Sequence, residues 1–241
     1  MMELPKDFTF YNSHLHIQTG TPESCLFNSI VSCDLREYPS LRVAYPNIFF
    51  SVGLHPWFLT EDGEKIAYSM ERLETVLFSD PLIMAVGECG LDKGKKAIAI
   101  EKQKIILQTQ WHLSIKYHKP LIFHIVRAWS ELLLLAKLGK KHPCGLIVHG
   151  FRGNVSLAKQ LLRAGFYLSV HSLCPTDTLR LALESNRLLL ETDASSISIE
   201  SVYRNVSQRL DIELPYLVEQ IQKTFLSLFP VRKTESIGSL D

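Results

Sequence analysis

Short apolar runs alternate with longer amphipathic stretches along most of this chain. We expect strands in the eight apolar runs at residues 8–12, 25–31, 48–53, 82–87, 120–124, 145–149, 166–170 and 188–190. Apolar residues at helical spacing predict helices between them, at residues 36–44, 64–78, 97–117, 129–138, 155–164 and 176–185. Strands that alternate with helices are typical of parallel βα units. Eight such strands favour a (β/α)8 TIM barrel over the alternative, a doubly wound open sheet.

Two of the βα connections are predicted to be short. Residues 17–24 carry Gly20 and Pro22 and are too few for a full helix, so we expect a loop after the first strand. After the last strand, the chain leads quickly into a helix predicted at 200–210 and a closing helix at 214–229. The polar residues 231–241 are predicted to form a disordered tail. Residues 1–241 are therefore expected to form one domain, a barrel shortened in its first and last βα connections.

Composition and charge exclude several classes of protein. The chain of 241 residues is 46% hydrophobic and 21% charged, as expected for a soluble globular protein with a sizeable core. The net charge of +1 predicts no general attraction to nucleic acid, so any affinity for phosphate must be local. No apolar stretch reaches the ~20 residues that span a bilayer, and the N-terminus has no signal-peptide core. Five scattered cysteines without a C-x-x-C pair fit a reducing compartment, so we expect a cytoplasmic protein that does not bind membranes.

Candidate metal ligands follow the predicted strands. His14 and His16 come after the first strand, and side chains two apart on extended backbone point the same way. Later apolar runs lead to Glu88, His124, His149 and Asp193. In a parallel barrel these positions meet at one face, and imidazole with carboxylate suits Zn, Fe, Mn or Mg. Six ligands are too many for one tetrahedral ion with an open position and suit two ions that share a carboxylate.

The stretches around these residues resemble a known family. They are residues 12–16 (NSHLH), 53–56 (GLHP), 86–92 (VGECGLD), 123–124 (FH), 149–153 (HGFRG) and 190–194 (LETDA). They occur in the order found in the TatD family of metal-dependent deoxyribonucleases, within the amidohydrolase-like TIM barrels. The resemblance covers roughly residues 8 to 229.

The resemblance implies a role for each site residue. His14 and His16, together with Glu88 and Asp193, would hold one divalent ion. Glu88, His124 and His149 would hold the other, so that Glu88 bridges the two ions. Asp193 would also orient or deprotonate the attacking water, and His55 would donate to the scissile phosphate. The residues by themselves indicate the same ligands but do not divide them between two ions.

The chain also departs from the family pattern. Asn12 stands where the family has an aspartate on the first strand, and Ala194 stands where proline follows the last aspartate. Arg127 lies one place later than the family arginine, and Arg152 replaces a small residue. Both arginines come three residues after a ligand histidine and are predicted to bind a substrate anion. Trp57 is a candidate either for stacking on a base or for packing at the barrel rim.

The sequence therefore predicts a two-metal hydrolase with Asp193 and Glu88 as catalytic residues. The expected cofactors are two divalent ions, Mg, Mn or Zn, and the expected substrate is a phosphodiester of nucleic acid, with single-stranded DNA favoured. The predicted oligomeric state is a monomer. One alternative is an amidohydrolase-type enzyme that cuts a small amide or ester. The other is a weakly active paralogue that serves as a binding module.

Overall fold

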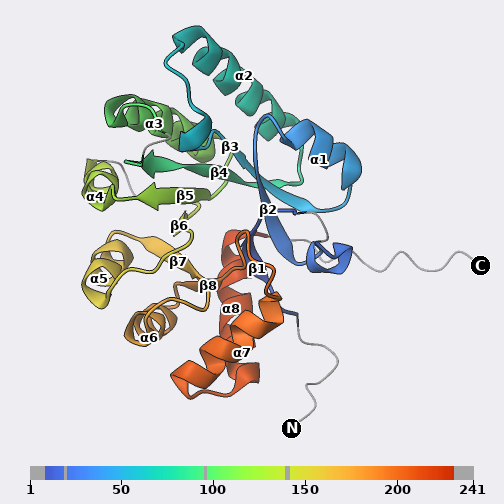
Figure 1. The fold of residues 1–241 in the computed structure, drawn as a ribbon, viewed down its shortest axis with the longest axis vertical. Helices are drawn as coiled ribbons and strands as arrows, with labels where there is room; N and C mark the ends of the chain where they lie inside the picture. The colour runs from blue at the N-terminus through green and yellow to red at the C-terminus, as the bar shows by residue number, and fades with distance from the viewer. Residues whose placement is uncertain (1–8, 19–20, 95–96, 139–141, 231–241) are drawn as a thin grey trace, which may run out of the picture.

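The computed structural model describes residues 9–18, 21–94, 97–138 and 142–230, and it contains an eight-stranded parallel sheet whose spatial order follows the sequence (Figure 1). The strands are β1 (Asn12–Leu15), β2 (Ser29–Asp34), β3 (Phe49–Gly53), β4 (Ile83–Asp92), β5 (Leu121–Val126), β6 (Leu146–Val148), β7 (Phe166–Val170) and β8 (Leu188–Leu190). The α-helices are α1 (Tyr38–Ala44), α2 (Gly63–Ser79), α3 (Ile100–Lys116), α4 (Trp129–Leu138), α5 (Val155–Arg163), α6 (Thr176–Glu184), α7 (Ile199–Leu210) and α8 (Leu214–Leu228). Short 3-10 helices lie at η1 (Glu23–Cys25) and η2 (Pro56–Phe58).

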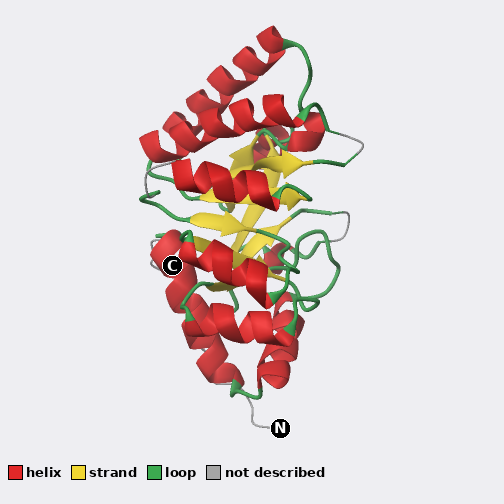
Figure 2. Ribbon diagram, turned by 90° about the vertical axis from the view of Figure 1, so that its left-hand side faces the viewer, coloured by secondary structure: helices red, strands yellow, loops and turns green. Residues whose placement is uncertain are grey.

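The sheet curls into a nearly closed barrel surrounded by helices (Figure 2). The first and last strands meet just beyond their ends, where Leu15 forms a parallel bridge with Asp193. The Asp193 amide donates to the His14 carbonyl at 3.0 Å, and the His16 amide donates to the Asp193 carbonyl at 3.2 Å. This closure confirms the predicted (β/α)8 barrel and excludes the doubly wound open sheet. It also fixes three candidate ligands to one another through backbone hydrogen bonds.

The core has two parts, because alternate strand residues face opposite sides of the sheet. One part packs the outer face of the strands against the helices. The other part lies inside the barrel, away from the carboxyl ends of the strands. It consists of Ile30, Ala85, Ile122, Ile147 and Leu189, together with Phe225, Leu228 and Phe229 at and just after the end of α8. Burial of each such large side chain contributes about 1.5–3 kcal/mol. This apolar floor supports the polar residues above it.

Several predicted elements match the structure and others are displaced. The predicted bounds of α4, β7 and β8 are confirmed. The second strand was predicted too early, since residues 26–28 form a turn and β2 runs on through Ser32 and Asp34. β2 pairs with β3 from Ile30 to Asp34, including Ser32 with Ser51. This pairing extends the strand over the polar residues Ser32 and Asp34, which an apolar run does not include. The first strand likewise begins at Asn12, later than predicted, so His14 lies within it.

The fourth and fifth strands also extend beyond their predicted ends. Gly90 pairs with His124 and Asp92 pairs with Val126, so Glu88 and His124 lie within strands rather than at their ends. Gly90 permits this close approach, because a Cβ atom there would lie 1.9 Å from the His124 carbonyl oxygen. The prediction that every ligand ends a strand was therefore wrong for His14, Glu88 and His124.

The two shortened connections are confirmed within the described residues. After β1 the chain forms only η1 before β2, and no α-helix is present in the described part of this connection. After β8 a short segment leads to α7, whose N-cap residue Ser198 accepts a hydrogen bond from the Ser201 amide at 3.2 Å. The predicted tail at 231–241 lies outside the described residues. None of the helices described here is long and apolar enough to cross a membrane.

Candidate metal centre

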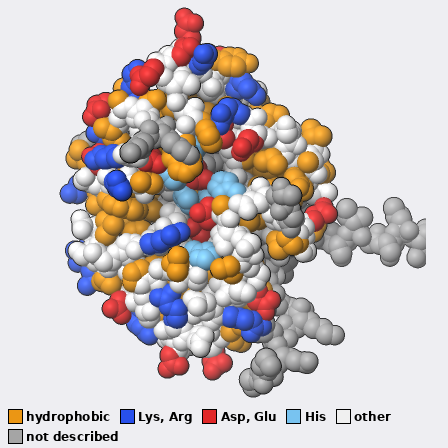
Figure 3. Space-filling view, in the orientation of Figure 1, with side chains coloured by type: hydrophobic (Ala, Val, Ile, Leu, Met, Phe, Trp, Pro, Cys, Tyr) orange, Lys and Arg blue, Asp and Glu red, His pale blue; other side chains and the backbone are white. Residues whose placement is uncertain are grey.

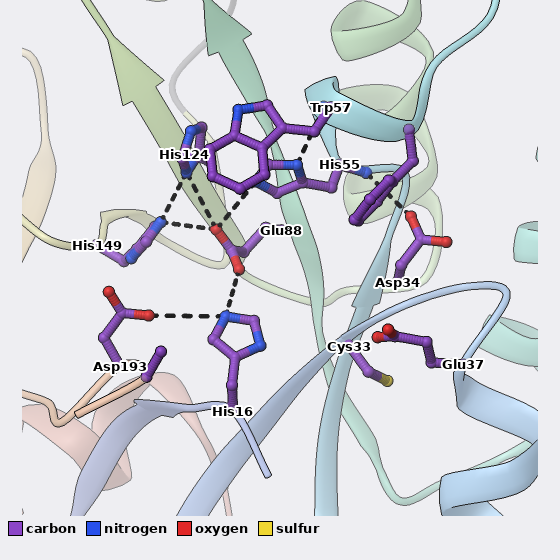
Figure 4. A pocket seen from close by; sticks show the side chains of 12 residues that line it. His16, Cys33, Asp34, Glu37, His55, Trp57, Glu88, His124, His149 and Asp193 are labelled. Carbon is purple, nitrogen blue, oxygen red and sulfur yellow. Dashed lines mark hydrogen bonds and ion pairs between the residues drawn. The ribbon is translucent and has the colours of Figure 1, made fainter. Parts of the chain in front are cut away.

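Glu88 lies at the centre of a cluster of histidines at the carboxyl end of the barrel (Figure 4). Its Oε1 atom is 2.7 Å from His16 Nε2 and 3.4 Å from His14 Nε2. Its Oε2 atom is 2.7 Å from His149 Nε2 and 3.3 Å from His124 Nδ1. One carboxylate oxygen therefore faces each pair of histidines, which is the arrangement that a bridging ligand requires.

Asp193 completes the side of the cluster formed by the first strand. Its Oδ1 atom lies 3.7 Å from the Nε2 atoms of both His14 and His16. The ligand atoms of these three residues lie within 4.8 Å of one another, and so do those of His14, Glu88 and His149. The structure thus brings together all six predicted metal ligands. The i, i+2 spacing of the two histidines places both rings on the same side, as predicted.

His14 provides the clearest evidence that the cluster fits a metal ion. Its Nδ1 atom is 2.8 Å from Ser32 Oγ, while its buried Nε2 atom has no hydrogen-bond partner among the described residues. Burial and the neighbouring His149 lower the pKa of His14, so its ring is neutral at neutral pH. A neutral imidazole whose second nitrogen faces carboxylates without a hydrogen bond is suited to coordination. These residues therefore fit a divalent cation.

Glu88 is ionised in this environment. Burial alone would raise its pKa, but His149 and His14 outweigh burial and hold the pKa well below its ordinary value. For His149 the opposite holds: burial would lower its pKa, but Glu88 and Glu191 raise it well above the ordinary range. Charge pairing between His149 and the carboxylates therefore helps to hold the cluster together. A cation bound at the same place would replace the proton on His149.

Glu191 positions His149 from behind. Its Oε1 atom is 3.8 Å from His149 Nδ1 and accepts a hydrogen bond from the Gly150 amide at 2.6 Å. Its other oxygen accepts from the Ser169 hydroxyl, and the side chain is completely buried. His149 and Ser169 thereby outweigh the burial of Glu191 and lower its pKa. A carboxylate behind a histidine in this way orients the ring and increases its basicity.

Asp92 has the same role for His124. Its Oδ2 atom lies 3.2 Å from His124 Nε2 and accepts a hydrogen bond from Trp57 Nε1 at 2.5 Å. Its Oδ1 atom accepts from the Gly94 amide at 2.5 Å. With Nε2 turned toward Asp92, His124 directs Nδ1 at Glu88. Trp57 is therefore part of the support of the cluster, which favours a packing role over base stacking.

His55 differs from the other histidines of the cluster. It caps η2, where its Nδ1 atom accepts a hydrogen bond from the Trp57 amide at 3.1 Å. The proton of the neutral ring must then be on Nε2, which lies 3.6 Å from Glu88 Oε2. Burial lowers the pKa of His55 to about 4. Although His55 lies close enough to Glu88 and His124 to form a third possible ligand group, its protonated Nε2 makes it a donor.

The cluster lines a cavity of about 330 Å³, and its histidines and carboxylates are visible in a hollow near the centre of the face in Figure 3. Besides the cluster, the cavity is lined by Cys33, Asp34, Glu37, Trp57, Phe58 and Ala194. Four of the lining residues are carboxylates, Asp34, Glu37, Glu88 and Asp193, and none of the lysines and arginines that the structure describes lines it. Cations bound at the cluster would add the positive charge that favours an anionic group in this cavity.

The predicted anion-binding arginines are not part of this cavity. Arg127 and Arg152 are exposed, and they follow β5 and β6 at the same end of the barrel. Lys93, from the basic run after Glu88, pairs with Glu131 at 2.6 Å, and Lys95 and Lys96 lie outside the described residues. The arginines therefore remain predictions for a substrate that extends beyond the cavity.

Sequence reasoning did not assign roles to Glu191, Asp92 or Glu37. Asp92 is four residues after Glu88, and Glu191 is two residues before Asp193. Even spacing on extended backbone places side chains on one face, so this spacing was a usable signal for the two supporting carboxylates. Glu37 lies just before α1, and nothing in the local sequence indicates that it lines the cavity.

Comparisons with known proteins agree with this geometry. The family model described as TatD related DNase matches residues 22–229. The uncharacterized metal-dependent hydrolase YjjV of Escherichia coli is 30% identical over 167 residues, which cover 66% of this chain and 63% of that protein. A protein of Edwardsiella piscicida named 3'-5' ssDNA/RNA exonuclease TatD is 27% identical over 190 residues, covering 75% of this chain and 72% of that protein. The alignment thus spans just under two thirds of the first of these relatives.

A solved structure supports the fold over a larger share of the chain. The crystal structure of the E. coli YJJV protein, described as a TatD homolog, superposes with a TM-score of 0.78 at 23% sequence identity. The match covers 92% of this chain and 98% of that one. At this level of identity the superposition supports the barrel architecture.

Proposed function

This chain belongs to the family of TatD-related DNases, and on that premise we propose that it is a two-metal hydrolase that cleaves phosphodiester bonds in single-stranded DNA. The observation that carries the proposal is the position of Glu88, with one oxygen facing His14 and His16 and the other facing His124 and His149. Divalent ions held there would acidify a water and offset negative charge at phosphorus.

Each residue of the proposed site has a distinct task. Glu88 would be the ligand shared by two divalent ions, Mg, Mn or Zn. Asp193 orients the attacking water and accepts its proton, because its side chain is about one third exposed and faces the cavity. The Nε2–H group of His55 donates to a phosphate oxygen, and Trp57 holds this tautomer through its amide.

The substrate class is supported from outside this chain. The relatives that carry an activity in their names are described as 3'-5' ssDNA/RNA exonucleases, so we propose the same direction of digestion here. Arg127 and Arg152 are proposed to contact phosphates at the rim, since both are exposed at the carboxyl ends of strands. We treat residues 1–241 as one domain that acts as a monomer, because one chain supplies all six ligands. Five free cysteines favour the cytoplasm.

The test measures metal content and hydrolysis together. The purified protein is stripped of metal and reloaded with Mg, Mn or Zn, and it is then given a labelled single-stranded oligonucleotide. We expect about two ions per chain and metal-dependent shortening from the 3' end. Retained metal without shortening would refute the nuclease proposal, and a chain that binds no divalent ion would refute the metal centre.

One observation favours a second candidate substrate. The cavity has four carboxylates and, among the described residues, no lining lysine or arginine, which suits a small uncharged amide or ester better than a phosphodiester when only one ion is bound. A panel of small amides and esters, tested with the same reloaded protein, separates the two reactions. Turnover of these compounds without cleavage of the oligonucleotide would identify the amidohydrolase alternative. If neither the oligonucleotide nor the small amides and esters are hydrolysed with any divalent metal, the remaining alternative is the paralogue that serves as a binding module.

A further inference from the structure

A second hollow adjoins the metal cavity and carries the opposite charge. It has a volume of about 250 Å³ and shares the lining residues Asp34, His55 and Phe58 with the cavity, so the two hollows are adjacent. It lies above the carboxyl ends of β2 and β3, between the start of α1 and the helix α2. We refer to it as the α2 groove.

One stripe of α2 forms the outer wall of the groove. Lys65, Tyr68, Ser69 and Arg72 all line it, at positions i, i+3, i+4 and i+7 of the helix. This spacing puts their side chains on a single face. The buried residues of α2 are Leu73 and Leu77, which pack into the core instead. The stripe is therefore not buried in the core, although Lys65 pairs with Asp62 at 3.3 Å and the Arg72 guanidinium lies 5.8 Å from the centre of the Tyr68 ring.

The inner wall presents a cation that is held in position. Arg36 Nε donates to Asp34 Oδ1 at 2.6 Å, and the guanidinium carbon lies 3.9 Å from the centre of the Phe58 ring. The two terminal nitrogens of Arg36 have no hydrogen-bond partner in the described part of the chain. Asp34 and Phe58 therefore fix the direction of a guanidinium that keeps most of its donors available.

The composition of the groove matches a flexible polyanion with aromatic bases. Its lining has three cations, Arg36, Lys65 and Arg72, against one carboxylate, Asp34. It also has two exposed aromatic side chains, Phe58 at 43% and Tyr68 at 62% exposure. Cations that follow a backbone and aromatic rings on which bases stack are the two elements of single-strand binding sites.

We propose that the α2 groove binds the nucleotides next to the scissile bond of a single-stranded nucleic acid, with Tyr68 stacking on a base and Arg36 and Arg72 contacting phosphates. This inference rests on the proposed function, because the strand enters the groove from the metal cavity. Divalent ions held by the cluster would stabilise the charge of the scissile phosphate, and the groove supplies the arginine and lysine side chains that are not found among the described lining residues of the cavity. The chain as a whole has a net charge of only +1. Its electrostatic attraction to an anionic strand must therefore come from local positive charge, such as that of the groove.

The test measures binding of a phosphorothioate-linked single-stranded oligonucleotide, which resists hydrolysis, to the full-length metal-loaded protein. We expect Tyr68→Ala to weaken binding about fivefold or more, and Tyr68→Phe to bind like the parent, since the ring is retained. For Arg72→Gln we expect weaker binding and a salt dependence reduced by about 0.7 in the slope of log K against log salt, the loss of one contact to a single strand.

Matched control variants lie elsewhere on the barrel. Tyr216→Ala removes an aromatic side chain of 49% exposure from α8, and Arg163→Gln removes an exposed arginine from α5. Neither residue lines the groove, so both variants should bind the oligonucleotide like the parent. Equal binding by the parent, Tyr68→Ala and Arg72→Gln would overturn the proposal. So would a parent that does not bind the strand at all.

A kinetic comparison separates this proposal from the proposed function. Bis-p-nitrophenyl phosphate is a diester with no nucleotides to reach the groove, so the groove variants should lower kcat/KM on an oligonucleotide by a larger factor than on this compound. An equal factor on both substrates would overturn the groove proposal and leave the hydrolase intact. If the parent hydrolyses neither compound, the proposed nuclease function is refuted. If the groove variants of that protein still bind the strand more weakly than the parent, the groove proposal is supported.

Discussion

The metal cavity and the α2 groove adjoin each other but differ in the charge of the side chains that line them. Among the described residues, four carboxylates and no lysine or arginine line the cavity, whereas three lysine or arginine side chains and one carboxylate line the groove. Asp92 and Ser32 support histidines of the metal centre from behind through hydrogen bonds, and Glu191 lies 3.8 Å behind His149. In the groove, by contrast, Tyr68 and Phe58 are exposed. Rigid support is thus concentrated where ligand geometry must be maintained.

This difference indicates how an anionic substrate is held. A cavity lined by carboxylates repels a phosphate until cations are bound, so reactivity and metal binding are coupled there. The groove can attract the phosphate backbone of the substrate strand through its own lysine and arginine side chains, without a bound metal ion. Substitutions in the cavity should therefore affect chemistry, and substitutions in the groove should affect binding of long substrates.

The largest effect is expected from the cavity. Asp193→Asn keeps the size of the side chain but removes the carboxylate that accepts the proton of the attacking water. We expect kcat to fall on the order of 10²–10⁴-fold on both the oligonucleotide and the small diester. The measurement is kcat at saturating metal, with circular dichroism to confirm the fold. A variant that keeps its full rate would contradict the assigned role.

His55→Ala should have the next largest effect, because it removes a donor to the phosphate. We expect a loss of about a hundredfold in kcat. The low pKa of His55, about 4, means that its neutral donating form dominates above that value and is lost only below it. The loss should therefore be the same at about pH 6 and about pH 8. A variant that loses activity only at one of these values would show that His55 titrates in the reaction.

Asp92→Asn should act on metal affinity rather than on chemistry. The carboxylate orients His124 and is held by Trp57, so its loss should weaken the ion bound by His124 by about 10–100-fold. Competition with a chelator measures this, and excess metal should restore most of the rate. Glu131→Gln is the control, since that carboxylate pairs with Lys93 outside the cavity. Equal metal affinity in the two variants would refute the positioning role.

The smallest effect is expected from Glu37→Gln, which reduces the difference in charge between the two regions. Glu37 lines the cavity but is not among the ligand groups of the described residues. Its removal reduces repulsion of an anionic strand, so KM should fall about two- to threefold at low salt and return to the parent value at high salt. Glu200→Gln, an exposed carboxylate on α7, should change nothing. An unchanged KM at low salt would contradict the electrostatic account.

Much of the site was predictable because parallel strands repeat a simple geometry. The spacing of His14 and His16 predicts that both rings face one side, and both lie within reach of Glu88. The tautomer of His55 was not predictable, because it depends on a cap formed with Trp57. The role of Asp92 also depends on pairing between β4 and β5, which carries both strands past their predicted ends.

The sequence by itself determined the barrel and the six candidate metal ligands, because apolar periodicity and ligand order are local properties of the chain. Only the tertiary structure decided which oxygen of Glu88 faces which histidines, and which carboxylates support them. It also decided that the stripe of Lys65, Tyr68 and Arg72 faces Arg36 and Phe58 across a groove. These relations join residues that are distant in sequence, and their geometry is fixed by strand register and helix packing.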